Sequence, residues 1–312
     1  MNSTLEHQLS NAPEAKNLDT AIAVDGLVKK FGRNTALNGL TMRVPRGSVY
    51  ALLGRNGAGK STLIQVLMGM LEPTSGDIRI LGLSPVSDAV SLKKVIGYIP
   101  DRLPMYDWMT VDELLRFVAD FYSNWSPEDE RDLVSRFRIA RDQKVGALSR
   151  GNRALLSLVV AMAHQPSLVL LDECTSGMDA IARREFERSV IEALQAGSRT
   201  VLFASHQIDE MERICDWVGI VDEGRMLLEM PIDELKASVK MLRLRAETAP
   251  DQLPGCKILA RKSTGREHHI TVQFDSAQEP RPVLPHGVEY VEEILLNLEE
   301  IFVALVGGEG EP

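Results

Sequence analysis

Residues 49–62 read VYALLGRNGAGKST, a short apolar run that leads directly into a glycine-rich loop. The loop has one glycine, four further residues and then Gly-Lys-Ser, a spacing that suits the binding of phosphate groups. Glycines let the backbone wrap around an anion, and the first N–H groups of a following helix point toward it. The stretch therefore predicts a strand, a phosphate-binding loop and a helix over residues 61–70 in immediate succession.

Nine consecutive residues make up the predicted phosphate loop and its entry into the helix. They are Gly54, Arg55, Asn56, Gly57, Ala58, Gly59, Lys60, Ser61 and Thr62. We expect Lys60 to reach the β and γ phosphates of a nucleotide, and the Ser61 hydroxyl is suited to Mg²⁺. A glycine-rich turn that merely connects two elements is the alternative, but both the spacing and the strand-loop-helix context favour the phosphate loop.

A second candidate site follows the apolar run at residues 168–171, where Asp172 and Glu173 come directly after it. Open α/β sheets bind ligands at the carboxyl ends of their strands. We expect Asp172 to hold Mg²⁺, directly or through water, and Glu173 to act as a general base that polarises the attacking water. An acidic pair at a strand end can also be a solvated turn, so the prediction depends on its combination with the phosphate loop.

The remaining pattern predicts an α/β fold with a mainly parallel sheet. Apolar runs at residues 95–99 and 201–204 are also followed by a turn and a helical pattern. Strand signals disappear over about residues 103–165, where apolar residues repeat at helical spacing and predict a helical subdomain. We expect a disordered tail over residues 1–20, a nucleotide-binding domain over 21–235 and a small α+β accessory domain over 236–312.

Two local signals shape the accessory domain. A hairpin is predicted with Ser263-Thr264-Gly265 in its turn, and a short amphipathic helix follows, at whose start Asn297 and Glu300 can form a capping pair. Adjacent residues of a strand face opposite sides, so we expect His268 and His269 to occupy exposed hairpin positions rather than a shared metal site.

The composition excludes several classes of protein. The 312 residues include 44 acidic and 35 basic side chains, for a net charge of −9, whereas a protein that tracks a nucleic-acid backbone needs a basic face. Cys174, Cys215 and Cys256 lack the paired spacing of a disulfide framework or a zinc site, which favours a reducing cytosol. The longest nearly apolar stretch, residues 154–163, is shorter than the roughly 20 residues of a membrane span, so we expect any membrane role to come through a partner.

The stretch Leu148-Ser149-Arg150-Gly151-Asn152 lies just upstream of the acidic strand. It resembles the signature motif of ATP-binding cassette (ABC) ATPases, usually written LSGGQ, with Arg150 and Asn152 in place of Gly and Gln. A serine hydroxyl and the free N–H groups of a helix start suit a phosphate. The resemblance implies that Ser149 and Gly151 contact the γ-phosphate of an ATP held by a second cassette, so that the functional unit is a dimer.

Other segments resemble the motifs of this family in the same order along the chain. Phe31 stands at the place of the aromatic residue that stacks on adenine, and residues 176–179, Ser-Gly-Met-Asp, resemble the loop along the dimer seam. His206 matches the switch histidine, which the resemblance implies to hydrogen-bond the γ-phosphate and hold the attacking water. Asp101 replaces the usual Gln near Mg²⁺; its carboxylate accepts from metal-bound water but does not donate as an amide does.

The resemblance implies a P-loop ATPase of the ABC type that binds ATP and Mg²⁺ and pairs with a second protomer, most simply as a homodimer. A separate transmembrane permease would be its partner, with the chain peripheral on the cytoplasmic face of the inner membrane. The part after residue 235 is similar to the extension of bacterial exporter ATPases, which favours export. Permease contacts are expected at Met105, Tyr106, Trp108 and Met109, although these side chains can instead fill the core of the helical subdomain.

Three other functions are alternatives to export. A soluble or regulatory ABC ATPase with low turnover is the main alternative, because Asp101 lacks the amide of the usual Gln. An ABC ATPase that acts on ribosomes or DNA would normally show tandem cassettes or a long coiled coil between the motifs, and this chain shows neither. A P-loop kinase or GTPase would leave the signature-like stretch and His206 unexplained.

Overall fold

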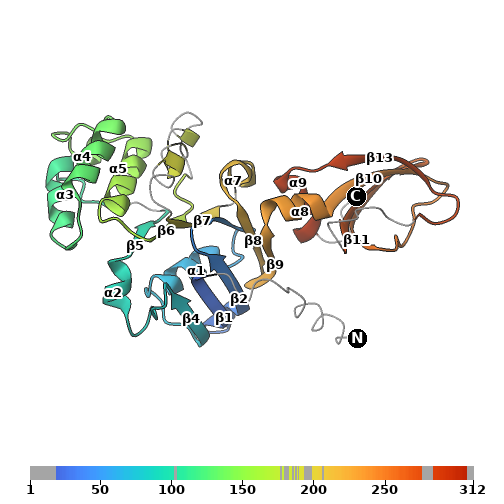
Figure 1. Cartoon of the computed structure of the whole chain (residues 1–312), viewed down its shortest axis with the longest axis horizontal. Helices are drawn as coiled ribbons and strands as arrows, with labels where there is room; N and C mark the ends of the chain where they lie inside the picture. The colour runs from blue at the N-terminus through green and yellow to red at the C-terminus, as the bar shows by residue number, and fades with distance from the viewer. Residues whose placement is uncertain are drawn as a thin grey trace.

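The computed structural model describes residues 19–101, 104–175, 178, 183–184, 186, 188, 190–192, 199–205, 207–275 and 284–307. The predicted tail over residues 1–20 lies outside this part of the chain except for its last two residues, and the first strand begins at Thr20. Three sheets and their helices make up the described structure (Figure 1).

The central sheet has six strands in the order β5-β6-β7-β3-β8-β9. Its strands are β5 (Ile96–Ile99), β6 (Leu168–Asp172), β7 (Thr200–Ser205), β3 (Val49–Leu53), β8 (Trp217–Asp222) and β9 (Arg225–Pro231). All neighbours pair in parallel except β8 and β9, which form an antiparallel edge. This arrangement confirms the predicted α/β fold with a mainly parallel sheet.

Both faces of the central sheet are covered, as its nearly continuous apolar strands require. On one face, Tyr50, Leu52 and Leu170 pack with helix α1 (Lys60–Leu67) and the antiparallel sheet described below. On the other face, Leu53 and Leu171 pack with α5 (Arg150–Met162) and α7 (Ile208–Ile214). Helix α1, which follows the phosphate loop, thus packs on one face of the central sheet, and α5, which follows the signature-like stretch, packs on the other.

An antiparallel sheet in the order β2-β1-β4 supports the α1 face. It consists of β1 (Thr20–Phe31), β2 (Asn34–Pro45) and β4 (Ser75–Ile80), followed by the short helix α2 (Ala89–Lys93). The sequence pattern does not predict these strands, because register shifts such as that between Val24 and Leu27 interrupt the alternation of buried and exposed residues.

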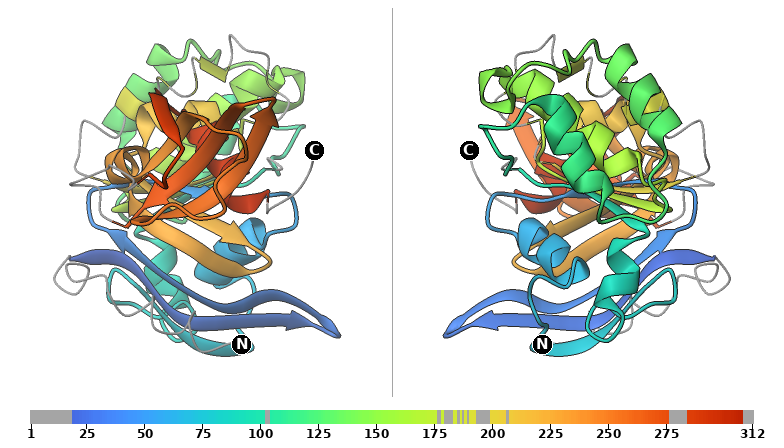
Figure 2. Two further views of the ribbon diagram at one scale, coloured as in Figure 1. Left: turned by 90° about the vertical axis from the view of Figure 1, so that its right-hand side faces the viewer. Right: turned by 90° about the vertical axis from the view of Figure 1, so that its left-hand side faces the viewer.

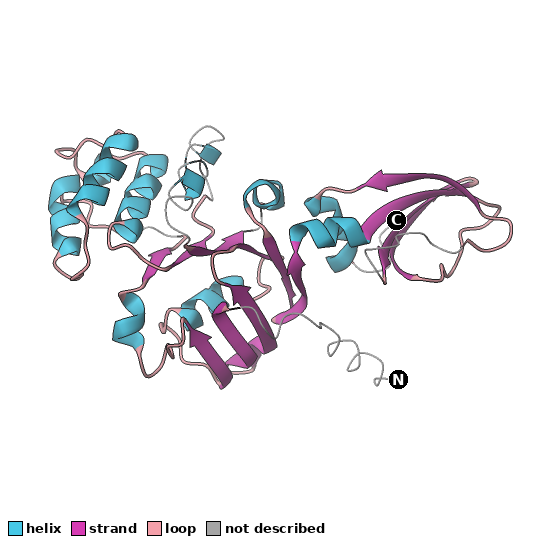
Figure 3. Ribbon diagram, in the orientation of Figure 1, coloured by secondary structure: helices cyan, strands magenta, loops and turns pink. Residues whose placement is uncertain are grey.

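Helices form the predicted helical subdomain at one end of the molecule (Figure 3). They are α3 (Val111–Ala119), α4 (Pro127–Arg136), the 3₁₀ turn η2 (Val145–Ala147) and α5, and no strand occurs among the described residues 104–165. Thr110 caps α3 in a reciprocal capping box with Glu113, and Ser126 caps α4, whose first residue is a proline. These local signals begin each helix where its apolar face can pack on α5.

The C-terminal part forms a four-stranded antiparallel sheet at the opposite end, which faces the viewer in the left view of Figure 2. Its elements are α8 (Ile232–Ser238), β10 (Val239–Arg245), β11 (Cys256–Thr264), β12 (Glu267–Phe274), β13 (Glu289–Leu295) and α9 (Leu298–Val306). The predicted β11–β12 hairpin is present, and Asn297 and Glu300 form the predicted capping box of α9. The exposed position predicted for His268 is wrong: the residue is buried, with ring nitrogens against Ser263 Oγ and the Ala246 carbonyl.

Candidate nucleotide-binding site

The phosphate loop connects β3 to α1 and approaches neighbouring backbone closely. Gly57 and Gly59 have φ angles of 83° and 108°, which side-chain-bearing residues rarely adopt. A Cβ on Gly54 would lie 2.5 Å from the Val221 carbonyl oxygen, and one on Gly59 would lie 2.7 Å from that of Ala36. Gly54 and Gly59 are therefore required for the loop to fit between β8 and β2, whereas Gly57 is favoured by its backbone conformation alone.

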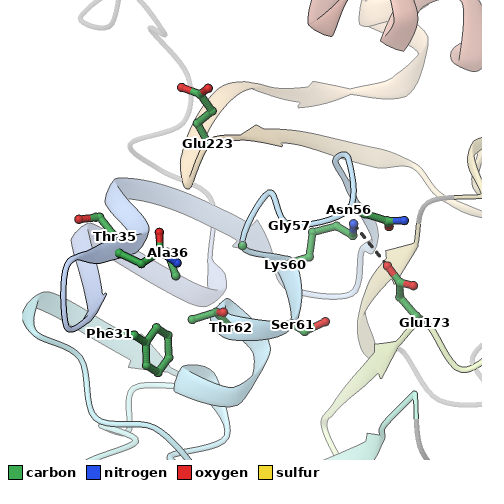
Figure 4. Close-up of a pocket in the computed structure, with 12 residues that line it drawn as sticks. Phe31, Thr35, Ala36, Asn56, Gly57, Lys60, Ser61, Thr62, Glu173 and Glu223 are labelled. Atoms are coloured by element: carbon green, nitrogen blue, oxygen red, sulfur yellow. Dashed lines mark ion pairs between the residues drawn. The ribbon is translucent and has the colours of Figure 1, made fainter.

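Lys60 and Glu173 meet at the base of the loop (Figure 4). The buried Lys60 Nζ donates to the carbonyls of Gly54 at 2.8 Å and Arg55 at 3.3 Å, and lies 3.4 Å from Glu173 Oε1. Glu173 has a φ of 48°, a left-handed conformation that costs a non-glycine residue about 1–3 kcal/mol. Its N–H donates to the Ala204 carbonyl at 2.9 Å, which helps to hold this conformation and to aim the carboxylate at the loop.

Ser61 and Asp172 form the oxygen pair predicted to hold Mg²⁺. Ser61 Oγ donates to Asp172 Oδ1 at 3.0 Å, from the first turn of α1 to the end of β6. Burial raises the pKa of Asp172, and the nearby negative charges of Glu173 and Asp101 raise it further, while the bond from Ser61 lowers it. A carboxylate with this surplus of negative charge around it suits a divalent cation, and hard oxygen ligands are those that Mg²⁺ prefers.

These two residues do not complete a metal site by themselves. Among the residues that the structure describes, no group of three or more His, Cys, Asp or Glu side chains is arranged to hold a metal ion. Mg²⁺ usually binds through one or two protein ligands, water and substrate phosphates. The Ser61–Asp172 pair fits that mode of binding, in which a nucleotide supplies further ligands.

A cleft of about 700 Å³ opens beside the phosphate loop. Eight predicted site residues line it: Phe31, Asn56, Gly57, Gly59, Lys60, Ser61, Thr62 and Glu173. Four lining residues were not predicted: Asn34, Thr35, Ala36 and Glu223. They come from the start of β2 and from the β8–β9 turn, so only the folded chain brings them to the loop.

Phe31 ends β1 at the rim of this cleft, with its side chain 47% exposed. Lys29 Nζ lies 5.0 Å from the centre of the Phe31 ring and donates to the Glu72 carbonyl at 2.7 Å. Lys29 thus covers part of the ring, while enough of it remains accessible for a planar base to stack on it.

Ser149 and Gly151 lie at the start of α5 and do not line the cleft of their own chain. The exposed Ser149 Oγ accepts the backbone N–H of Asn152 at 3.2 Å and so caps the helix. A serine hydroxyl can accept this bond and still donate its own hydrogen to another group. Ser149 is consequently able to serve as helix cap and phosphate donor at once, toward a ligand outside its own cleft.

The other predicted site residues occupy different surroundings. Within the phosphate loop, Gly54 and Ala58 are buried and Arg55 is exposed. Asp101 is exposed just after β5, close enough to raise the pKa of Asp172. His206, Ser176, Gly177 and Asp179 lie outside the described residues.

The sequence is similar to that of known proteins over most of its length. Residues 37–176 match the family model described as ABC transporter. The chain is 33% identical over 221 residues to the bacitracin transport ATP-binding protein BcrA of Bacillus licheniformis, covering 70% of this chain and 72% of that protein. It is 30% identical over 311 residues to the daunorubicin resistance ATP-binding protein DrrA3 of Streptomyces coeruleorubidus, covering 93% and 96%.

Solved structures give the same result. A structure of an ATP-binding subunit of an ABC transporter matches with a TM-score of 0.63 and 28% identity, covering 70% of this chain and 92% of that one. CbiO1 from Clostridium perfringens, described as part of an ABC transporter complex, matches with a TM-score of 0.62 and 27% identity over 70% and 90% of the two chains.

Proposed function

Because the chain belongs to the ABC transporter family as an ATP-binding and ATP-hydrolysing subunit, we propose that it closes as a dimer around two ATP molecules and drives a separate permease. The observation that carries this proposal is the pairing of Ser61 with Asp172 at 3.0 Å beside the contact of Lys60 with Glu173 at 3.4 Å. A phosphate-binding ammonium, a hydroxyl suited to Mg²⁺ and a candidate general base share one end of the cleft.

The proposed roles follow from the chemistry of each side chain. Lys60 binds phosphate oxygens through its ammonium group, while Phe31 stacks on the adenine ring. Glu173 accepts a proton from the attacking water, and a positioned general base of this kind contributes about 10²–10⁴-fold to a rate. Ser61 and Asp172 would hold Mg²⁺, which when bound neutralises charge on the phosphate oxygens.

A dimer is proposed because the signature-like residues do not line the cleft of their own chain. Ser149 lies exposed at the start of α5 with its hydroxyl hydrogen available, and Gly151 follows it in the first turn. A second copy can present these groups to the phosphates in the first copy's cleft. His206 and Asp101 are proposed to complete the site near the attacking water.

A row of exposed aromatic rings supports the proposed docking of a permease. Trp108 and Tyr106 stand in the loop of residues 104–109, here called the aromatic loop. Phe117 on α3 and Phe121 in the turn just after that helix continue the row. Neighbouring ring centres lie 5.2–6.0 Å apart, and Trp108 and Phe121 are each 67% exposed. Exposed aromatic clusters are typical of protein interfaces.

The partner proposed for this surface is a helix of the permease that projects on the cytoplasmic side. Within the described ranges, none of the helices combines the length and the apolar composition that a bilayer span requires. Met105 and Met109 of the same loop pack instead against the core of the helical subdomain. The methionines therefore anchor the loop, whereas the exposed rings of Tyr106 and Trp108 are the ones proposed to contact the permease.

Export is the proposed direction of transport. It is supported by the relatives named for bacitracin transport and daunorubicin resistance, the second of which aligns along almost the whole chain, including the C-terminal residues proposed as an accessory domain. A regulatory ATPase with low turnover remains the second candidate, because the Asp101 carboxylate cannot donate a hydrogen bond where the family has an amide.

The dimer can be tested with Glu173→Gln, which keeps the size of the side chain and removes the general base. This variant is expected to elute from a size-exclusion column as a dimer with Mg²⁺ and ATP and as a monomer with ADP. Glu128→Gln, a change of an exposed residue on α4, is the matched control and should hydrolyse ATP without accumulating a dimer. A Glu173→Gln variant that binds ATP and stays monomeric would contradict the proposal.

A further inference from the structure

The aromatic loop is fixed by its backbone to the segment that leads into α5. Val145 N donates to the Met109 carbonyl at 2.9 Å, and Gly146 N donates to the Asp107 carbonyl at 3.0 Å. A Cβ on Gly146 would lie 3.0 Å from that same oxygen, so the two segments approach as closely as a glycine permits. Residues 145–147 form η2, and Ser149 follows two positions later.

One ion pair extends this contact into the first turn of α5. Arg153 Nη2 lies 2.6 Å from Asp107 Oδ1, and the Arg153 side chain is only 23% exposed. The backbone N–H of Arg153 donates to the Ser149 carbonyl at 2.9 Å. Asp107 itself stands between the exposed Tyr106 and Trp108, so a single side-chain contact joins the aromatic loop to the turn that Ser149 caps.

We infer that Asp107 and Arg153 are a positioning pair, which makes the aromatic loop and the first turn of α5 move as one body. A partner held at Tyr106 or Trp108 then fixes the position of the Ser149 hydroxyl. Coupling between two sites is reciprocal, so ATP bound by Ser149 must also act on the loop. The inference rests on the proposed function, because it takes Ser149 as a contact of ATP in the dimer.

Dimer formation in a Glu173→Gln background gives the first test. Arg153→Ala is expected to raise the ATP concentration at which half of the protein is dimeric, measured by sedimentation, by about two- to fivefold. This is the range expected when one partly exposed ion pair is lost at each composite site. Binding of a fluorescent ATP analogue to the monomer should not change, because Arg153 does not line the cleft. Arg153→Lys, which keeps the charge, should return the half-maximal ATP concentration most of the way to the parent value.

A matched control separates positioning from simple stabilisation. Arg116→Ala removes another Arg–Asp ion pair of the helical subdomain, the one with Asp112, without touching the aromatic loop or α5. It should leave the half-maximal ATP concentration unchanged. If Arg153→Ala lowers the melting temperature but dimerises at the same ATP concentration as its parent, the positioning role is wrong.

Trp108 offers a second readout at the other end of the link. The contribution of Trp108 to the tryptophan fluorescence is obtained by subtracting the spectrum of the Glu173→Gln protein that also carries Trp108→Phe from the spectrum of the Glu173→Gln protein. We expect this contribution to change when ATP drives dimerisation, and to change less than half as much with Arg153→Ala at an equal fraction of dimer. An equal change in both proteins would overturn the inference, whereas a Glu173→Gln protein that never dimerises would refute the proposed function together with it.

Discussion

Replacement of Glu229 by Gln should remove a pH dependence of the free energy of unfolding. This dependence arises where β9 of the central sheet meets β2 of the antiparallel sheet. Glu229 on β9 accepts the backbone N–H of Arg43, at 2.9 and 3.1 Å to its two oxygens, and the Tyr50 hydroxyl at 2.8 Å. Burial raises the pKa of Glu229 to about 7 from an ordinary value of 4.5, although both hydrogen bonds oppose the shift. The carboxyl group therefore takes up a proton in the folded protein at a pH where the unfolded chain has lost it.

The sign and size follow from proton linkage. A folded-state pKa above the unfolded value means that the folded protein binds more protons between pH 4.5 and 7, so stability is lost as the pH rises through this window. The two pKa values give a contribution of about 2.5 kcal/mol at pH 5 that falls to about 0.1 kcal/mol at pH 8. For a chain of this length, the typical entropy of unfolding converts the loss to about 4 °C in melting temperature.

The assay compares the melting temperatures of the wild type and Glu229→Gln by circular dichroism from pH 5 to pH 8. The amide oxygen of Gln can still accept a hydrogen bond, and its side chain does not titrate. Other groups with shifted pKa values, such as Asp172 and His164, contribute equally to both proteins and cancel in the difference. A difference in melting temperature that is the same at pH 5 and pH 8 would refute the assignment of this pH dependence to Glu229.

Three further changes test separate parts of the molecule. Lys60→Ala should lower kcat for ATP hydrolysis by at least about 100-fold, measured by phosphate release, because the phosphates lose their buried cation; retained activity would reject the phosphate-loop assignment. Gly219→Ala should lower the free energy of unfolding by about 1–3 kcal/mol in urea titrations, since the new Cβ would lie 2.1 Å from the Tyr50 hydroxyl; an unchanged midpoint would mean that the two strands can separate there at no cost. Tyr106→Ala and Trp108→Ala should abolish co-purification with the permease while the melting temperature stays within about 2 °C, because both side chains are exposed; co-purification at the wild-type level would reject this docking surface.

The parts of the site that the sequence predicts are those whose chemistry is contiguous along the chain. The phosphate loop joins β3 to α1 within a few residues, so spacing alone identifies Lys60 and Ser61. Asp172 and Glu173 are found in the same way, because they end a continuous apolar strand. The distance between Ser61 and Asp172 is a different kind of fact: 111 positions separate them, and only the parallel sheet brings them together.

Residues that meet through long-range pairing leave no such pattern. Glu229 and Tyr50 are 179 positions apart, and neither stands in a motif that marks a buried carboxyl group. Glu223 reaches the cleft from the β8–β9 turn, where Gly224 packs against Ala36. His268 shows the opposite failure: a polar residue in a hairpin is expected at the surface, but two hydrogen-bond partners satisfy its ring in the interior.

The residues of the candidate site belong to two different faces of the central sheet. The order of the motifs along the sequence therefore predicts the chemistry of each residue better than it predicts how the residues come together. The cleft draws its residues from the end of β1, the start of β2, the phosphate loop, α1, the end of β6 and the β8–β9 turn. Of these elements, α1, β1 and β2 pack together on one face of the central sheet. Ser149 belongs to the other layer, where its hydroxyl caps α5 and faces solvent. A hydroxyl needed only as a helix cap would be satisfied by that one bond, so Ser149→Asp, which also caps well but carries negative charge, separates the two roles. It should preserve the melting temperature and weaken ATP-driven dimerisation, because a carboxylate repels phosphate oxygens where a hydroxyl donates to them.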